Sequence, residues 1–69
     1  MNAIKWQGQR TCDFCGKEGL KTLIDGKTIY GPWGVMCDVC FRIKGVGLGT
    51  GRGQRYVDDG KGSLIKIAG

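Results

Sequence analysis

Four cysteines in two pairs carry the clearest chemistry in this sequence. Cys12 and Cys15 form one C-x-x-C motif, and Cys37 and Cys40 form a second, with twenty-one residues between the pairs. A two-residue gap lets one tight turn direct two thiolates at a single point, and structural Zn²⁺ is bound by four such ligands in a tetrahedron. Paired C-x-x-C motifs at about this separation are a recognised zinc spacing. We therefore predict one structural Zn²⁺ bound by these four residues.

Two disulfides or an iron centre are the alternatives to zinc. Disulfides are typical of small secreted proteins, but no charged-then-apolar leader opens this chain. Rubredoxin-type iron sites use two C-x-x-C-G motifs, and here Gly16 follows the first pair whereas Phe41 follows the second. A glycine in this position can adopt positive φ and let backbone N–H groups turn onto the thiolates. The missing leader favours zinc over disulfides, and the missing second glycine favours zinc over iron.

The second cysteine pair is expected at the start of a short helix. Residues 37–44 predict two helical turns because Cys37, Cys40 and Phe41 follow the spacing i, i+3, i+4. Gly45 follows at a position where helices commonly end. A helix of this length does not persist alone, so we expect the metal to hold it.

A β-hairpin over residues 20–30 is expected to bring the two cysteine pairs together. Asp25-Gly26, between the segments 20–24 and 27–30, is a type I′ turn signal. A turn with two cysteines, then a hairpin, then a helix is the order of a treble clef. The sequence thus predicts a small zinc-stabilised α+β fold, a treble clef with an added C-terminal hairpin. The alternative is a zinc ribbon, with a second cysteine turn and a strand after Cys37.

The length of 69 residues allows one small domain. Such a chain buries only about 60% of its unfolded surface, so a metal, disulfides or a partner must supplement the core. Its predicted segments are an N-terminal strand or arm (1–9), the zinc finger (10–45), a Gly/Arg-rich segment (46–54) and a C-terminal hairpin (55–69). We expect the rings of Trp6 and Trp33 to pack in the small core rather than to stack on nucleic-acid bases.

Glycines at every second position characterise the segment 46–54. The pattern matches neither the G-x-G-x-x-G fingerprint nor the P-loop, so no nucleotide cofactor is expected. Three interpretations remain: an extended segment lying against another surface, a flexible arm that orders on a phosphate backbone, or an unstructured linker.

The segment around the second cysteine pair resembles a GATA-type treble-clef finger. The stretch Trp33-Gly-Val-Met-Cys37-Asp-Val-Cys40 leads into a lysine-bearing helix, and GATA-type fingers also carry a Trp shortly before their second C-x-x-C. The resemblance covers about residues 10–45 and implies a treble-clef fold around zinc. Here the loop between the cysteine pairs is longer, and the arginine pair that normally follows the Trp is absent. These departures argue against base-specific recognition of DNA.

A second and longer resemblance is to small zinc proteins of bacteriophage genomes. Its residues are Gly31-Pro-Trp33, before the second C-x-x-C, and Gly45-Val-Gly-Leu-Gly-Thr-Gly-Arg-Gly-Gln54, after it. This resemblance implies a phage origin and no particular mechanism. We expect a soluble protein of the cytoplasm, which is the host cell's cytoplasm if a phage encodes it.

One stretch of the chain carries only positive charge. The formal net charge is +5, from eleven basic and six acidic residues, and no acidic residue lies between Asp38 and Asp58. A Zn²⁺ with four thiolates would leave about +3 in all. A consistent sign is what a phosphate-binding surface requires. The basic residues of this stretch are Arg42, Lys44, Arg52 and Arg55.

The composition excludes several classes of enzyme. The chain has no histidine, which removes two-cysteine, two-histidine fingers, HNH-type nucleases, zinc deaminases and Ser-His or Cys-His catalysis. A site of four thiolates has no open position for water. Asp58 and Asp59 are adjacent and are interpreted as turn formers. We therefore expect no catalytic activity.

Two functions remain open. One is a nucleic-acid-binding module, for DNA or RNA, whose basic residues in the stretch 42–55 contact phosphates. The other is a protein-interaction module that binds and modulates a host protein such as RNA polymerase or a nuclease. The basic residues could equally be solvated surface without a partner. No membrane is expected as a partner, because no apolar run approaches the ~18 residues of a membrane span.

Overall fold

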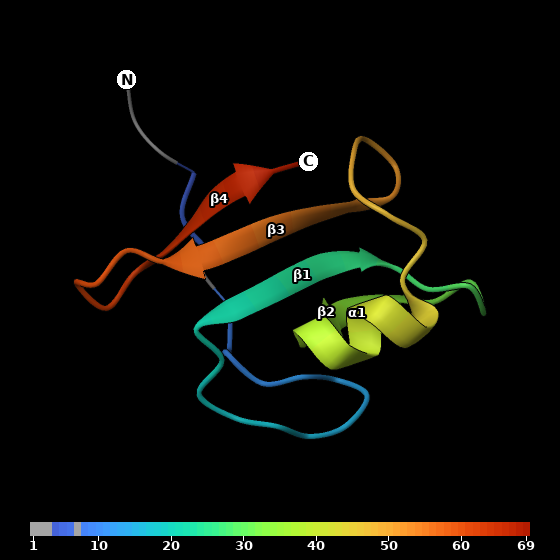
Figure 1. The fold of residues 1–69 in the computed structure, drawn as a ribbon, viewed down its shortest axis with the longest axis horizontal. Coiled ribbons are helices and arrows are strands. Elements are labelled where there is room, and N and C mark those ends of the chain that lie inside the picture. The colour runs from blue at the N-terminus through green and yellow to red at the C-terminus, as the bar shows by residue number, and fades with distance from the viewer. Residues whose placement is uncertain (1–3, 7) are drawn as a thin grey trace.

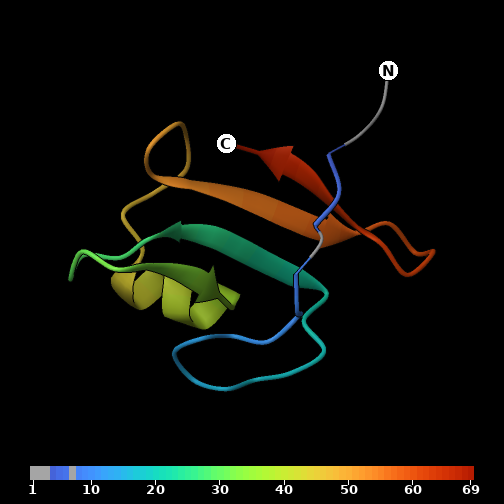
Figure 2. The ribbon, with the colours of Figure 1, turned by 180° about the vertical axis from the view of Figure 1, so that it is seen from behind.

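Four antiparallel strands and one helix make up the fold. The computed structural model describes residues 4–6 and 8–69 (Figure 1). Its elements are β1 (Thr22–Lys27), β2 (Trp33–Met36), α1 (Asp38–Lys44), β3 (Gly53–Asp58) and β4 (Leu64–Ala68). The strands form one sheet in the order β2-β1-β3-β4, and α1 covers one face of its β2–β1 side, as the opposite views of Figures 1 and 2 show. The predicted α+β class is confirmed. None of the described helices is long and apolar enough to cross a membrane.

The turn of the first hairpin lies later in the chain than predicted. Asp25 and Gly26 are inside β1, and the chain reverses between Thr28 and Pro32, where the Thr28 N–H donates to the Pro32 carbonyl oxygen at 3.0 Å. The Thr28 hydroxyl donates to the same oxygen at 2.9 Å. Gly31 has a φ of 107°, which only glycine adopts readily. The prediction of an Asp25-Gly26 turn is therefore wrong.

Gly26 is required by close strand packing instead of by a turn. It lies opposite Gly53 in the β1–β3 pair. A Cβ atom on Gly26 would lie 2.8 Å from the carbonyl oxygen of Arg52 and 3.0 Å from the Cα of Gly53. A glycine inside a strand often marks such a close backbone approach.

The helix begins and ends within one residue of its predicted bounds. Cys37 is its N-cap, and the Cys37 sulfur accepts a hydrogen bond from the Cys40 N–H at 3.5 Å. Gly45 caps the C-terminus with a φ of −77°, so it does not adopt a left-handed conformation. A side chain there would instead collide with the ring of Phe41. The glycine is needed for space around Phe41.

The glycine-rich segment folds as a compact loop. Its glycines 47, 49 and 51 have positive φ values of 125°, 125° and 77°. The loop closes where the N–H of Gly49 donates to the carbonyl oxygen of Gly53 at 2.8 Å and the N–H of Gly53 donates back to Gly49 at 3.0 Å. Leu48 packs against the core. This loop is neither an extended segment nor an unstructured linker.

Strands β3 and β4 form a C-terminal hairpin with an aspartate-rich turn. The Asp58 carboxylate accepts from the Gly60 N–H at 2.7 Å, and the Asp59 carboxylate accepts from the Lys61 N–H at 2.7 Å. Both aspartates thus act as turn formers. The N-terminal segment pairs with β4, since the Trp6 N–H donates to the carbonyl oxygen of Leu64 at 2.9 Å. Residues 1–3 and 7 of the predicted segment 1–9 lie outside the described residues.

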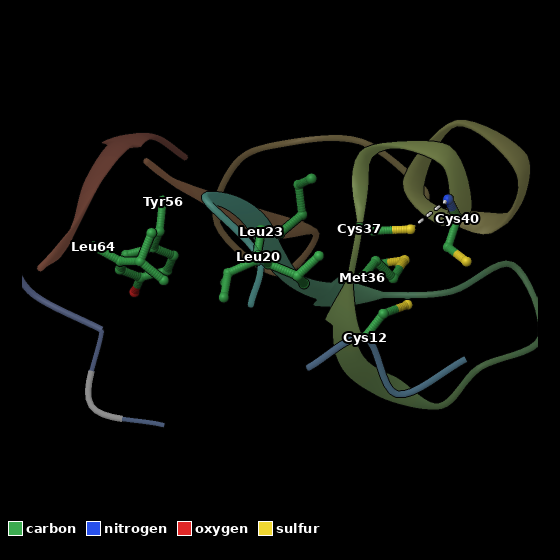
Figure 3. Packing of buried hydrophobic residues seen from close by; sticks show 9 residues of the cluster. Cys12, Leu20, Leu23, Met36, Cys37, Cys40, Tyr56 and Leu64 are labelled. Carbon is green, nitrogen blue, oxygen red and sulfur yellow. Dashed lines mark hydrogen bonds between the residues drawn. The ribbon is translucent and has the colours of Figure 1, made fainter. Parts of the chain in front are cut away.

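The core has a sulfur-rich end and an apolar end (Figure 3). Trp6 packs against Tyr56 at the apolar end, with ring centroids 5.3 Å apart and ring planes tilted by 55°. Trp33 is 47% exposed, so the prediction that it packs in the core is wrong. Ile67 of β4 is also largely exposed, at 61%. The buried core residues are Cys12, Leu20, Leu23, Ile24, Met36, Cys37, Cys40, Tyr56 and Leu64.

Candidate metal centre and basic surface

A tight turn positions the first cysteine pair. The N–H of Gly16 donates to the carbonyl oxygen of Cys12 at 3.0 Å, and Gly16 has the positive φ, 78°, that its place after the pair suggests. Two hydrogen bonds fasten this turn to the edge of β2. The Asp13 N–H donates to the carbonyl oxygen of Val35, and the Val35 N–H donates to the Asp13 carboxylate, each at 2.8 Å. The first cysteine pair is therefore held beside the strand that leads to the second.

The second cysteine pair is positioned by the junction of β2 and α1. Cys37 directly follows β2, and Cys40 lies one helical turn later. Because β1 and β2 are paired from Ile24–Met36 to Lys27–Trp33, the hairpin carries the chain back to the first pair. The predicted placement of both cysteines in the first turn of a helix matches this arrangement, with Cys37 as the cap.

The four sulfur atoms converge on one point. All four ligand atoms of Cys12, Cys15, Cys37 and Cys40 lie within 4.8 Å of one another. The sulfurs of Cys15 and Cys37 are 3.7 Å apart. A tetrahedron of sulfurs with metal–sulfur bonds of about 2.3 Å has edges of about 3.8 Å. The four cysteines are therefore placed to bind one metal ion, as a Cys₄ zinc site requires.

The cysteines are free thiols, which distinguishes this arrangement from two disulfides. Three of them are buried and Cys15 is exposed. Burial disfavours the Cys12 thiolate, but backbone N–H groups, chiefly that of Cys37, outweigh it and lower the pKa of Cys12 to about 6. Burial and the neighbouring thiols raise the pKa of Cys40 to about 12. One thiolate thus hinders the next in a shared site, and a divalent cation is what allows all four to ionise together.

The four predicted basic residues do not form a single patch. Arg42 and Arg55 share a shallow depression with Asp38 and Phe41. The Arg55 guanidinium pairs with the Asp38 carboxylate at 2.7 Å and lies 5.7 Å from the centre of the Phe41 ring. Arg55 is thus partly neutralised within the chain, whereas Arg42 is exposed.

Lys44 and Arg52 lie elsewhere. The Lys44 ammonium is 5.0 Å from the centre of the Phe14 ring, in the turn of the first cysteine pair. Arg52 belongs to the glycine-rich loop and lies along Gly47 and Gly49, where added Cβ atoms would be 3.8 Å from the Arg52 side chain. The positive stretch of the sequence is therefore distributed over three places.

Acidic and basic side chains have different roles in the fold. Five of the six acidic residues accept hydrogen bonds from within the chain, and Glu18 is the sixth. Two ion pairs form within residues 4–6 and 8–69, Arg10–Asp58 and Arg55–Asp38, each at 2.7 Å. The other nine basic residues are outside these pairs. The hydrogen-bonded acids are Asp13, Asp25, Asp38, Asp58 and Asp59.

Two apolar side chains of α1 are exposed, and the sequence analysis assigned them no role. Val39 is 59% exposed and Ile43 is 65% exposed. Ile29, 60% exposed, is joined to the helix end by a hydrogen bond from its N–H to the carbonyl oxygen of Lys44 at 2.8 Å. The spacing i, i+4 of Val39 and Ile43 is the signal that could have identified them as one exposed pair.

Comparisons with known proteins were made for the whole chain. No family model, curated protein or solved structure matches it. The likeness to GATA-type fingers and to bacteriophage zinc proteins stays a prediction from the sequence. We therefore assign function from the geometry of the residues themselves.

Proposed function

We propose that the chain is a structural zinc module of the treble-clef type. The order of its parts supports this: a cysteine turn, the β1–β2 hairpin, then α1 with Cys37 as its cap and Cys40 in its first turn. A zinc ribbon would have a second cysteine turn and strand in place of α1. Four thiolates saturate a tetrahedral ion, so we further propose that the site is structural and that the protein is not an enzyme.

The partner that we propose is the phosphate backbone of a nucleic acid. The observation that carries this proposal is the unequal use of charge in the fold. The acids serve as turn formers, docking groups and ion-pair partners, whereas only Arg10 and Arg55 among the basic residues pair with a carboxylate in the described part of the chain. The formal net charge is +5 and most of the basic side chains are outside these ion pairs, so a polyanion is the complementary ligand.

Salt dependence tests the proposal directly. Arg55 already pairs with Asp38, so if Arg42, Lys44 and Arg52 neutralise phosphates, log K should fall against log salt with a slope of about −3 on duplex DNA. The double variant Arg42→Gln/Lys44→Gln should reduce the steepness by about two. Glu18→Gln, which changes one exposed acid, is the matched control and should not weaken binding. Absence of DNA and RNA binding at low salt would refute the proposal.

The exposed apolar residues of α1 favour a second candidate, a protein-interaction module. A protein partner of this kind packs against apolar side chains. Substitutions of Val39 and Ile43 should therefore lose more affinity than substitutions of charged residues. The double variant Val39→Ser/Ile43→Ser separates the two candidates. It should leave nucleic-acid affinity unchanged under the first proposal and abolish a nuclease-resistant complex with a host protein under the second. A phage origin and a cytoplasmic location stay predictions.

A further inference from the structure

Trp33 is exposed yet held in a fixed orientation. It is 47% exposed at the start of β2, and its indole N–H donates to the Asp25 carboxylate at 2.8 Å. Trp6, by contrast, packs against the core and against the tilted ring of Tyr56. An aromatic ring that is already oriented loses little conformational freedom when a flat ligand stacks on it. Trp33 is therefore a preformed platform.

Trp33 lies on the sheet face opposite α1. Arg55 contacts α1 through Asp38 and Phe41 and is directly opposite Ile24 of β1, so Ile24 faces the helix. Successive residues of a strand point to opposite faces, which places Asp25 on the other face. The contact between Asp25 and the Trp33 indole confirms that Trp33 shares that face.

Two basic residues follow Trp33 across the same end of the sheet, Lys27 on the next strand and Arg52 beyond Lys27. Lys27 is the direct cross-strand partner of Trp33 in the β1–β2 pair. On its other side, the Lys27 N–H donates to the carbonyl oxygen of Arg52 at 2.8 Å. Neighbouring strands are about 4.8 Å apart, so the three backbones span about 10 Å. The β1–β2 turn and the glycine-rich loop project from this end (Figure 1).

The charge of this end suits an anion. Lys27 and Arg52 are exposed, and neither belongs to an ion pair in the part of the chain that the structure describes. Asp25 on this face accepts the Trp33 indole N–H and keeps its negative charge, so the two cations and this carboxylate leave a net charge of +1. Glycines 47 and 49 leave the Arg52 side chain room to lie along the loop. An aromatic platform with Lys27 on the next strand and Arg52 beyond it matches a stacked base that is followed by phosphates.

We infer that this end of the sheet binds single-stranded nucleic acid, with a base stacked on Trp33 and the adjoining phosphates held by Lys27 and Arg52. The inference rests on the proposed nucleic-acid function and names the form of nucleic acid that the chain prefers. A stacked base must be unpaired, so a duplex can be held through its phosphates but cannot use Trp33. Stacking is tolerant of sequence because every base has a flat face.

The test measures affinity for a single-stranded oligothymidine and for a duplex of equal length. Trp33→Ala should weaken single-strand binding by about 5- to 150-fold, the range of one stacked base, and leave duplex binding unchanged. Trp33→Phe, which keeps a ring, should restore most of the loss. Ile67→Ala removes another exposed apolar side chain, 61% exposed on β4, and should change neither affinity.

Lys27→Gln tests the phosphate contact. It should flatten the salt dependence of single-strand binding by about 0.7 in slope, and Lys61→Gln is its matched control. Lys61 is equally exposed but lies in the β3–β4 turn, at the opposite end of the sheet from the glycine-rich loop (Figure 1). Equal effects of the two lysine variants would show that charge acts without a local site.

The outcomes separate the inference from the proposed function. If Trp33→Ala leaves single-strand affinity unchanged while salt-sensitive binding persists, the inference is overturned and the proposed function stands. If no nucleic acid binds at low salt, both fail. Unchanged near-ultraviolet circular dichroism away from the Trp33 band, and unchanged metal content, would establish that Trp33→Ala still folds.

Discussion

The two ends of the core are held by different interactions. At one end, Cys12, Cys37 and Cys40 are buried around Met36, and four sulfurs are placed to bind one metal ion. At the other end, Trp6, Tyr56 and Leu64 pack together by apolar burial. Figure 3 shows Leu20 and Leu23 between the two groups. The difference teaches that a chain of this size supplements a thin apolar core with coordination chemistry instead of enlarging the core.

The apolar end also carries a set of polar contacts between Arg10, Asp58 and Gly62, called the clasp below. The Arg10 guanidinium pairs with Asp58 at 2.7 Å and donates to the carbonyl oxygen of Gly62 at 2.6 Å. This contact ties the segment before the first cysteine pair to the β3–β4 turn. The two ends are therefore linked through the chain as well as through Leu20 and Leu23, and we expect them to unfold together once the metal is lost.

The largest effect should follow from removing one ligand or the metal. Cys12→Ser, or chelation of the wild-type chain, should abolish the native fold, because structural zinc supplies apparent binding energies of about 10–16 kcal/mol, whereas a core this small supplies about 3–5 kcal/mol. Elemental analysis should give one zinc per chain, and near-ultraviolet circular dichroism should report the loss. Readdition of zinc should restore the chelated wild type. A chelated sample with a native spectrum would contradict the comparison.

The second-largest loss of stability is expected from a change at the apolar end of the core. Leu64 is 1% exposed, so Leu64→Ala should lower the free energy of unfolding by about 2–5 kcal/mol through lost burial and an unfilled cavity. Thermal unfolding of the zinc-loaded protein measures it. Ile67→Ala, on the same strand but largely exposed, is the control and should stay within about 0.5 kcal/mol. Equal effects at the two positions would mean that the apolar end is not packed as described.

Gly26→Ala probes the close approach of β1 and β3 between the two ends. The new methyl group would press on the backbone of Arg52 and Gly53, and overpacking of this kind costs about 1–3 kcal/mol. Denaturant unfolding of the zinc-loaded protein measures the change. Gly34→Ala is the comparison, because its nearest neighbours, at 3.0 Å, are side-chain atoms of Phe14 and Asp13 that can adjust. A neutral Gly26→Ala would contradict the close approach of β1 and β3 at this position.

The smallest effect concerns the clasp and depends on pH. The hydrogen bond from Arg10 is the main cause that lowers the pKa of Asp58 below its ordinary value of 3.8. A carboxyl group with a lowered pKa in the folded state stabilises the protein above its ordinary pKa, and this contribution disappears as the pH falls through the lowered value. The difference in melting temperature between wild type and Arg10→Gln should therefore be constant above pH 3.8 and shrink below it. Acid also releases metal from thiolates, so melting temperatures are compared only in samples that retain one zinc per chain by elemental analysis. Lys61→Gln serves as a control that leaves the clasp intact. A difference that grows on acidification would contradict the pairing.

Much of the metal site could be predicted from the sequence because its spacing is local. The interval between Cys37 and Cys40 is one helical turn, and Gly16 after Cys15 marks a tight turn, so each pair presents its sulfurs through interactions within a few residues. The helix bounds follow from the same periodicity. The two cysteine pairs meet as long as a hairpin of about the right length connects them. The predicted turn position is wrong, but the predicted ligands do not depend on it.

The tertiary structure alone decided how glycines, tryptophans and charges are used. Gly26 has the sequence context of a turn, and the approach of β3, distant in the chain, makes it a strand residue. Trp6 is covered because Tyr56 lies across from it, and Trp33 is exposed because no segment covers its end of the sheet in the described residues. Arg55 is partly neutralised by Asp38 from α1, whereas Arg42 belongs to neither ion pair of the residues that the structure describes. These outcomes depend on which distant segments meet, whereas propensity and spacing report only on neighbours along the chain.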